Sequence, residues 1–426
     1  MNDEVQMTKP CLGPVARRTF LTGGLGGLLS LCIPRWQAMA AVADAKRRGK
    51  SCILLWMNGG PSHLDTFDPK PGTATGGPFE AISTSAPGVK ICEHLPLLAE
   101  QARHLAIIRS MTSKEGNHDR GQYLMHTGYA PSGTLKHPSL GSWVSHELGD
   151  PNFELPNFVS IRGPSISSGF LGVQHNPFTV QDPNQGVRNL PLAKDVDRSR
   201  FSARREALAI LQDGFRAETH AAAVANHDAV YDKSVRLMQS SLVKAFNIKD
   251  EPRAVQQAYG DSDFGRGCLM ARRLIETGVR FVEVTLDGWD THIDNFTKTT
   301  YLMHDLDPAF AALIRDLEER HMLDDTLIVW MGEFGRTPKI SPADGRDHYP
   351  NAWATVLAGG GVRGGQAFGS TDAEGARVAS HPVTVPDYFA TIARLLGMDP
   401  KHEEISPVGR PIAISDGGKP IAALIG

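Results

Sequence analysis

The chain has 426 residues, of which 41% are hydrophobic and 21% are charged, so it can form one large α/β domain or two to three smaller ones. Its formal net charge of −3 offers no basic surface for nucleic acid or for an anionic membrane. No apolar run is long enough to span a bilayer. The pattern of strands and helices along the sequence decides between the remaining classes of protein.

The first 40 residues have the layout of an export signal. Arg17 and Arg18 precede a stretch rich in glycine and leucine, and Ala38-Met39-Ala40 follows it as an A-x-A cleavage site. The arginine pair indicates the twin-arginine type. We therefore predict a signal over residues 1–40 and a protein that is exported by the twin-arginine route to the periplasm or the extracellular space.

Short apolar runs alternate with helical patterns along the rest of the chain. The runs lack polar alternation, as expected of strands covered on both faces, and they lie at 52–57, 105–108, 157–161, 279–286, 326–331 and 354–358. Apolar stripes at helical spacing predict helices between them, at 231–246, 264–275 and 302–317. Pro386 and Gly397 delimit another helix near the C-terminus. The pattern predicts an α/β fold with a doubly wound, mostly parallel sheet and helices on both faces.

Polar, metal-capable side chains follow four of these strands. The segments are "NGGPSHLD", "RSMTSKEGNHDRGQYLMHTG", "DGWDTHIDN" and "GEFGRTP", the last followed by "DGRDHYP". Ligands of such sheets bind outside the carboxyl ends of the strands, where these side chains would meet. Converging acids and imidazoles need a cation to neutralise them, and mixed N/O donors suit Zn²⁺ first, with Mn²⁺, Mg²⁺ or Ca²⁺ as alternatives. The residues expected in one crevice are Asn58, His118, Asp287, Asp290, His292, Glu333, Asp347 and His348.

Each segment also has a purely structural interpretation. Asp287 or Asp290 can cap the next helix, and Asp347 with His348 can form a surface turn. Glu333 can form a structural ion pair with a nearby arginine, and His118 can simply follow a helix cap. For each residue taken singly, the structural interpretation is better supported than a role in a metal site. The shared position of all the segments after strands favours a common site.

The order of these motifs resembles a bacterial secreted family, the domain of unknown function 1501 family, which is typical of planctomycete-like bacteria and usually equipped with a twin-arginine signal. The resemblance covers residues 51 to about 400 and carries the segments "LLWMNGGPSHLDTFDPKP", "DGWDTHIDN", "IVWMGEFGRTP" and "GRDHYP". The family looks like a distant branch of the alkaline phosphatase and sulfatase superfamily. This likeness implies a single alkaline phosphatase-like domain over residues 51–426, with divalent metal at the strand ends and a hydroxyl nucleophile at a helix N-terminus.

The superfamily pattern is only partly kept. Asn58 stands where its first metal-ligating Asp is expected, with Asp65 as a nearby substitute, and His118 stands where its Ser or Thr nucleophile is expected. Asp287 or Asp290 with His292 corresponds to its Asp and His pair at a different spacing. Glu333 replaces an Asp-His pair, whereas the last His ligand matches His348.

Two functions are compatible with this pattern. The first is a secreted metal-dependent hydrolase of phosphate or sulfate esters, acting on a small anionic ester or on a sulfated or phosphorylated glycan. In it, His118 would be nucleophile or general acid/base, and Arg336 and Arg346 would hold the anion. The alternative is a catalytically silent relative that binds an anionic glycan or a cell-envelope partner. The missing hydroxyl favours the second function, and the retained acidic and histidine loops favour the first.

Overall fold

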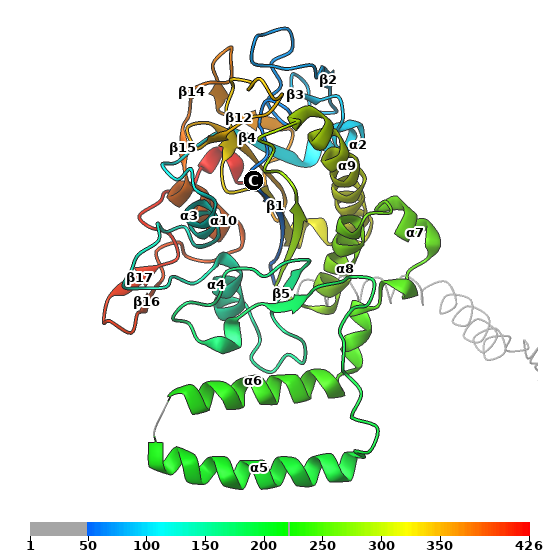
Figure 1. Ribbon diagram of the computed structural model, residues 1–426, viewed down its shortest axis with the longest axis vertical. Helices are drawn as coiled ribbons and strands as arrows, with labels where there is room; N and C mark the ends of the chain where they lie inside the picture. The colour runs from blue at the N-terminus through cyan, green and yellow to red at the C-terminus, as the bar shows by residue number, and fades with distance from the viewer. Residues whose placement is uncertain (1–48, 220–221) are drawn as a thin grey trace, which may run out of the picture. The chain divides into compact units, whose positions relative to one another are not determined.

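A computed structural model of the chain describes residues 49–219 and 222–426 (Figure 1). The signal predicted over residues 1–40 lies outside the described residues. Residues Lys50–Gly426 form one compact unit. Within the described part of the chain, no helix is both long and apolar enough to cross a membrane.

A nine-stranded sheet in the order β12-β4-β11-β8-β1-β7-β5-β6, with β15 paired to β4, forms the centre of this unit. The strands are β1 Ser51–Asn58, β4 Leu105–Thr112, β5 Phe158–Ile161, β6 Phe178–Val180, β7 Phe281–Asp287, β8 Thr326–Met331, β11 Trp353–Gly359, β12 Gln366–Phe368 and β15 Val383–Thr384. Strand β11 is antiparallel to both its neighbours, and all other pairs are parallel. The predicted α/β fold with a mostly parallel sheet is confirmed.

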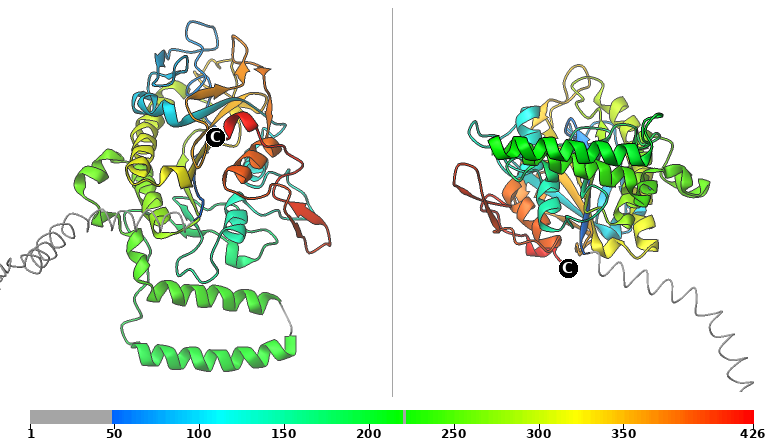
Figure 2. Two further views of the ribbon diagram at one scale, coloured as in Figure 1. Left: turned by 180° about the vertical axis from the view of Figure 1, so that it is seen from behind. Right: turned by 90° about the horizontal axis from the view of Figure 1, so that it is seen from below.

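Helices cover the two faces of the sheet, as Figures 1 and 2 show. Alternate side chains of β1 point to opposite faces. Ile53, Leu55 and Met57 pack in a core with helices α2, α8 and α9, whereas Leu54 and Trp56 pack in a second core with α3, α4 and α10. The bounds of these helices are α2 Pro96–Gln101, α3 His118–Thr127, α4 Leu140–Glu147, α8 Asp263–Thr277, α9 Asn295–Glu319 and α10 Val385–Leu395.

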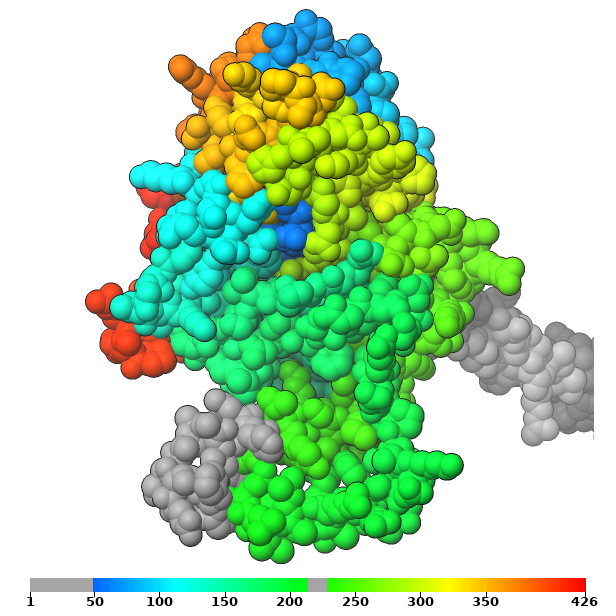
Figure 3. Space-filling model, viewed as in Figure 1, coloured from blue at the N-terminus to red at the C-terminus, as the bar shows by residue number. Residues whose placement is uncertain are grey.

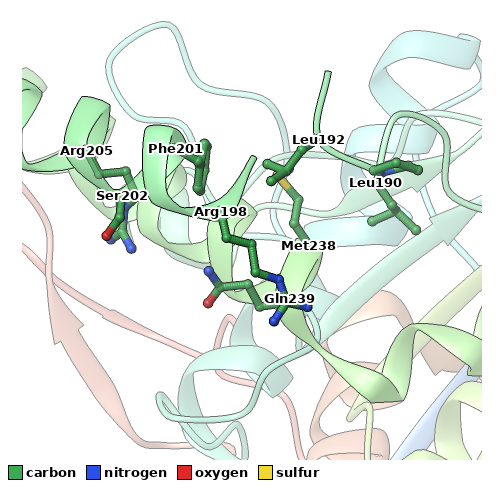
Figure 4. A pocket seen from close by; sticks show the side chains of 9 residues that line it. Leu190, Leu192, Arg198, Phe201, Ser202, Arg205, Met238 and Gln239 are labelled. Atoms are coloured by element: carbon green, nitrogen blue, oxygen red, sulfur yellow. The ribbon is translucent and has the colours of Figure 1, made fainter. Parts of the chain in front are cut away.

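One predicted helix is divided in the structure. Helix α6 covers Ala222–Gln239, and Ser240 then caps a separate 3₁₀ segment, Ser241–Phe246, by accepting a hydrogen bond from the backbone of Leu242. Helix α6 runs beside α5 (Arg198–Thr219), as both views in Figures 1 and 2 show. A pocket between them takes its apolar side chains from a preceding loop and from both helices (Figure 4). Its lining contains no carboxylate or imidazole, so it offers no donor set of the predicted kind.

The carboxyl ends of β1, β4, β7 and β8 lie along one edge of the sheet, because these strands run in the same direction. Asn58 is directly beside Asp287 in the register of β1 and β7. The reversed strand β11 begins at this same edge. The segment between β8 and β11, residues 332–352, therefore leaves the sheet and returns to it at the edge where the other strands end.

Candidate functional site

Three imidazoles converge on one carboxylate at this edge. Nε2 of His118 lies 3.3 Å from Oδ2 of Asp290. Nε2 of His292 and of His348 lie 3.0 and 3.3 Å from its Oδ1, and the two nitrogens are 3.0 Å from each other. We call these four residues the imidazole cluster. They come from three parts of the chain, which follow β4, β7 and β8, and these strands all end at the same edge of the sheet.

The other ring nitrogen of each imidazole is held by the protein. Nδ1 of His118 lies 2.7 Å from Oε1 of Glu333, and Nδ1 of His292 lies 2.9 Å from Oδ1 of Asp347. Nδ1 of His348 lies 2.7 Å from the carbonyl oxygen of Gly116, which can only accept a hydrogen bond. In the neutral rings Nδ1 therefore carries the hydrogen, and the three Nε2 atoms present their lone pairs to a common space.

The local sequence explains how His118 and the loop that contains His292 are placed. His118 is the first residue of α3, whose preceding residue, Asn117, caps the helix by accepting a hydrogen bond from the backbone of Arg120. The loop after β7 is fixed by Trp289, which is fully buried and whose backbone N–H donates to the carbonyl of Asn58 at 3.1 Å. Asp290 and His292 extend from this anchored loop.

Glycines allow the loops around the cluster to approach one another closely. A Cβ on Gly59, which has a φ of 115°, would lie 2.3 Å from the backbone nitrogen of Asp290. A Cβ on Gly345 would lie 1.7 Å from the carbonyl oxygen of His292. Since backbone atoms on both sides leave no room for a side chain, these glycines are required by the packing of the loops.

The electrostatic environment differs between members of the cluster. Burial would raise the pKa of Asp290, but the guanidinium of Arg336 at 2.6 Å and the neighbouring imidazoles outweigh burial and lower this pKa to about 2. The hydrogen bond to Glu333 raises the pKa of His118. Burial lowers the pKa of His348. Asp290 is therefore a carboxylate, and His348 a neutral imidazole, at neutral pH.

The donor set fits a divalent cation of the zinc type. Metal–ligand bonds of about 2.0–2.2 Å in a tetrahedron place neighbouring donor atoms about 3.3 Å apart, close to the distances within the imidazole cluster. His118, Asp290 and His348 each offer a donor atom such that all three lie within 4.8 Å of one another. The buried Nε2 of His118 and Oε2 of Glu333 have no hydrogen-bond partner. The lone pairs on Nε2 of His292 and Nε2 of His348 face each other at 3.0 Å, and a cation between them removes their mutual repulsion.

The remaining residues of the predicted crevice lie around the cluster. Glu333, which is fully buried, also accepts a hydrogen bond from the backbone of Gly59 at 2.9 Å. Asn58 donates to Asp287 at 2.8 Å. The structure thus brings together at one edge all eight residues that the sequence placed there, with Glu333 and Asp347 holding rings and Asn58 paired with Asp287.

Gln122 and Trp289 contribute to this edge without having been singled out from the sequence. The side chain of Gln122 donates to Oδ1 of Asn58 at 2.6 Å. It lies four residues after His118 on α3, so helical spacing places both on one face and could have indicated it. Nothing in the sequence distinguishes Trp289 as a loop anchor from an ordinary core tryptophan.

Three further predicted site residues are buried beside the cluster: Asp65, Arg336 and Arg346. Arg346 and Asp65 form a fully buried pair, with Nε to Oδ2 at 2.7 Å and a second hydrogen bond to Oδ1 at 3.0 Å. Arg336 is also fully buried. Its guanidinium donates to Asp290 and to the carbonyls of Gly59, Gly60 and Arg346. The hydrogen-bonding groups of both arginines are directed into the protein.

The open side of the cluster faces solvent. The side chains of Asp290 and His292 are 45% and 42% exposed, and that of Asp347 is 71% exposed. Figure 3 shows the blue segment that contains β1 at the base of a hollow between cyan and yellow-green parts of the chain. Small or extended ligands can therefore reach these side chains from outside. The arrangement can hold a cation on one side and present it to an incoming anion on the other.

Comparisons with known proteins identify a family and several similar structures. The family described as "Protein of unknown function (DUF1501)" matches residues 49–425. Among curated proteins, none matches the sequence. Matching structures include the PsFucS1 sulfatase from Pseudoalteromonas sp., with 13% identity, 85% of this chain and 71% of that chain covered, and a TM-score of 0.39.

Two further matching structures come from other bacteria. The lipoteichoic acid synthase LtaP from Listeria monocytogenes has 11% identity, coverages of 89% and 76%, and a TM-score of 0.37. The C-terminal periplasmic domain of EcEptC from Escherichia coli, solved in complex with Zn, has 10% identity, coverages of 86% and 89%, and a TM-score of 0.37. These likenesses concern the arrangement of sheet and helices. The chemistry of the site has to be argued from its own residues.

Proposed function

The chain belongs to the DUF1501 family, and from the geometry of its site we propose that it is a metal-dependent hydrolase of phosphate or sulfate esters. The observation that carries the proposal is the convergence of three Nε2 atoms on the carboxylate of Asp290. Imidazoles oriented through Nδ1, with their other nitrogens directed to one point, are typical of metal ligands. We expect Zn²⁺, with Mn²⁺, Mg²⁺ or Ca²⁺ as the ions to compare.

The proposed roles follow from where each side chain lies. His118, Asp290, His292 and His348 hold the cation, while Glu333, Asp347 and the carbonyl of Gly116 fix the rings. When bound, the cation supplies Lewis acidity toward an oxygen of the ester. Arg336 fixes the carboxylate of Asp290. Because Arg336 and Arg346 are buried and hydrogen-bonded internally, we assign them to holding loops in place and not to binding the substrate anion.

The ligand role proposed for His118 leaves water as the attacking group. Among residues 49–219 and 222–426, no Ser or Thr hydroxyl hydrogen-bonds a side chain of the imidazole cluster. We therefore propose direct hydrolysis: a water oxygen bonds to phosphorus or sulfur, the bond to the ester oxygen breaks, and the alcohol leaves with a proton. Solvent reaches the cluster on its open side, as this step requires.

The lack of a Ser or Thr hydroxyl bonded to the imidazole cluster, among the described residues, also favours a second function. A site in which no described Ser or Thr hydroxyl bonds to the imidazole cluster, and in which Arg336 and Arg346 are hydrogen-bonded internally, can bind an anionic glycan or a cell-envelope partner through its cation without cleaving it. Under either function we place the protein in the periplasm or outside the cell, on the twin-arginine pattern of residues 1–40.

Metal content and turnover distinguish the two functions. We expect the purified protein to contain zinc and to hydrolyse generic aryl phosphate or aryl sulfate esters, and we expect His348→Ala to lose the turnover and to contain less zinc than wild type. His304, whose side chain is 87% exposed on α9, provides the matched control His304→Ala, which should keep both.

Each result has a defined meaning. Zinc that is present in wild type and reduced in His348→Ala, without turnover of either ester, would support the binding protein. If wild type, His348→Ala and His304→Ala contained equal amounts of zinc, the imidazole cluster would not be a metal site, and both versions of the proposal would fail.

A further inference from the structure

A second group of imidazoles and carboxylates joins the end of α4 to a hairpin near the C-terminus. It consists of His146 and Glu147, the last two residues of α4, and of His402 and Glu404 at the start of the hairpin. The hairpin is formed by β16 (Glu403–Ile405) and β17 (Pro411–Ala413) and is drawn in red in Figure 1. We call these four residues the hairpin cluster. It shares no residue with the imidazole cluster.

The contacts of the hairpin cluster link the four side chains in a ring, in which His146 takes part through both of its ring nitrogens. Nδ1 of His146 lies 2.9 Å from Oε1 of Glu147, which lies 3.4 Å from Nε2 of His402. The same Nε2 lies 3.5 Å from Oε1 of Glu404, which lies 3.9 Å from Nε2 of His146. His146, Glu147 and Glu404 offer donor atoms that all lie within 4.8 Å of one another.

The backbone holds the residues of this ring in place. The N–H of His402 donates to the carbonyl of Asp399 at 2.9 Å, and its carbonyl accepts from Ile414 at 3.1 Å. The hydroxyl of Tyr129 donates to the carbonyl of Ala413 at 2.8 Å and so ties the base of the hairpin to the segment after α3. The backbone segments that carry these side chains are therefore held in place, although the side chains themselves lie at the surface.

The charges of the ring are poorly balanced without a cation. Glu147 ends α4, where the carbonyl ends of the helix disfavour a carboxylate. Its carboxylate and that of Glu404 both approach the single nitrogen of His402. The hairpin also contains little apolar surface to hold it down, since Ile405 and Val408 are 66% and 58% exposed. A cation would neutralise two carboxylates and would fasten the hairpin to the domain.

We propose that the hairpin cluster binds a Zn²⁺ ion that links α4 to the β16–β17 hairpin. Two imidazoles and two carboxylates form a neutral tetrahedral site with this ion, and all four are ordinary zinc ligands. Contacts of 3.4, 3.5 and 3.9 Å are close to the separation of about 3.3 Å between neighbouring donors in such a tetrahedron. The site is structural, and it does not depend on the proposed hydrolase function.

Zinc content of the full chain tests this proposal. After loading with zinc chloride and dialysis, we expect wild type to retain one more zinc per chain than His402→Asn or Glu404→Gln. Glu403→Gln is the matched control, because Glu403 is exposed on the same strand and is outside the ring; it should bind as much zinc as wild type. His348→Ala removes a ligand of the imidazole cluster only, so it should keep the zinc of the hairpin cluster.

Amide hydrogen exchange gives a readout that separates the two metal sites. Adding Zn²⁺ should slow exchange in residues 402–413 of wild type and of His348→Ala, and should leave it unchanged in His402→Asn. Circular dichroism of His402→Asn should match wild type, since His402 is at the surface. The proposal is overturned if His402→Asn and Glu404→Gln, folded as wild type, bind as much zinc as Glu403→Gln.

Discussion

A histidine can serve as a strong metal ligand only when its ring is held in one orientation, and in the imidazole cluster three different groups provide this. Two are carboxylates, Glu333 and Asp347, and the third is the carbonyl of Gly116. Glu333 is fully buried, whereas Asp347 is 71% exposed. Water can compensate for the loss of Asp347 but cannot reach the position of Glu333. We therefore expect the buried carboxylate to contribute more to metal affinity.

Replacing Glu333 by Gln should weaken zinc binding by about 10–100-fold while leaving the fold intact. The neutral amide keeps an oxygen but loses the charge that orients the ring of His118 and makes it basic. Competition with a chromogenic chelator measures the affinity. Glu319→Gln, at the exposed end of α9, is the control and should bind zinc as wild type does. Equal affinities for the two variants would show that Glu333 does not act on the metal.

Asp65→Asn should lower the free energy of unfolding by about 3–5 kcal/mol without loss of zinc, because the change leaves the buried guanidinium of Arg346 without its counter-charge. Urea denaturation measures the stability, and elemental analysis measures the zinc. A variant that kept its stability but lost zinc would identify Asp65 as a metal ligand, as its sequence position near Asn58 had suggested.

At the scale of elements, two loops meet beside the cluster without side chains between them. The backbone of Arg346 donates to the carbonyl of Thr291 at 3.0 Å, and Asn295 donates to the carbonyl of Asp344 at 2.8 Å. Gly345 lies between these two hydrogen bonds and directly against the carbonyl of His292. The position of His292 relative to His348 is therefore set by this contact between loops.

A side chain on Gly345 should disrupt the cluster. In Gly345→Ala the new Cβ would overlap the carbonyl of His292, so the two loops must separate. Since a displacement of about 1 Å can reduce a rate about 100-fold, we expect a loss of that order in any hydrolytic activity, together with weaker zinc binding. Gly133→Ala is the control, because no atom lies within 4 Å of its Cβ position. Normal zinc binding by Gly345→Ala would mean that the loops adjust without moving the ligands.

At the scale of the whole molecule, a buried ion pair connects α3 to the middle of the sheet. Nε2 of His126 lies 3.2 Å from Oε1 of Glu283, and both residues are almost fully buried. Burial alone would lower the pKa of His126, but the carboxylate of Glu283 outweighs it and the pKa is raised. Ser165 donates a hydrogen bond to the other oxygen of Glu283.

This pair should make stability depend on pH. An imidazole whose pKa is raised in the folded state contributes stability that is fully present below its unfolded pKa of about 6.5 and is lost as the pH rises through the folded value. We expect the free energy of unfolding to fall between about pH 6.5 and the higher pH at which folded His126 titrates. Urea denaturation across this range measures the effect. His126→Gln should be less stable at low pH and should show a smaller fall, and an equal fall in both proteins would contradict this assignment.

The sequence predicted the sheet better than it predicted the chemistry of single residues. Each of the six apolar runs corresponds to a strand of the sheet, because a strand covered by helices on both faces needs a largely unbroken apolar run, and this holds for the antiparallel β11 as for the five parallel strands. The meeting of the polar segments at one edge of the sheet could also be predicted, because parallel strands end at the same edge. The pairing of Asp65 with Arg346 could not be predicted, because the two residues are far apart in sequence and either could have faced the cluster. Which ring nitrogen points inward depends on rotamers that spacing does not determine.

The reversal of β11 also affects the order in which the site can be assembled during folding. Strands β8 and β11 are sheet neighbours that are consecutive among the sheet's strands and joined by residues 332–352, so Glu333, Asp347 and His348 can take up their positions through contacts nearby in sequence, which form early. His118 and Asp290 arrive only when β4, β1 and β7 have joined the same sheet. A complete set of chelating groups would then exist only in a nearly native chain. We expect bound zinc to slow unfolding and to have little influence on the rate of folding, because a ligand absent from the transition state acts on the unfolding limb alone.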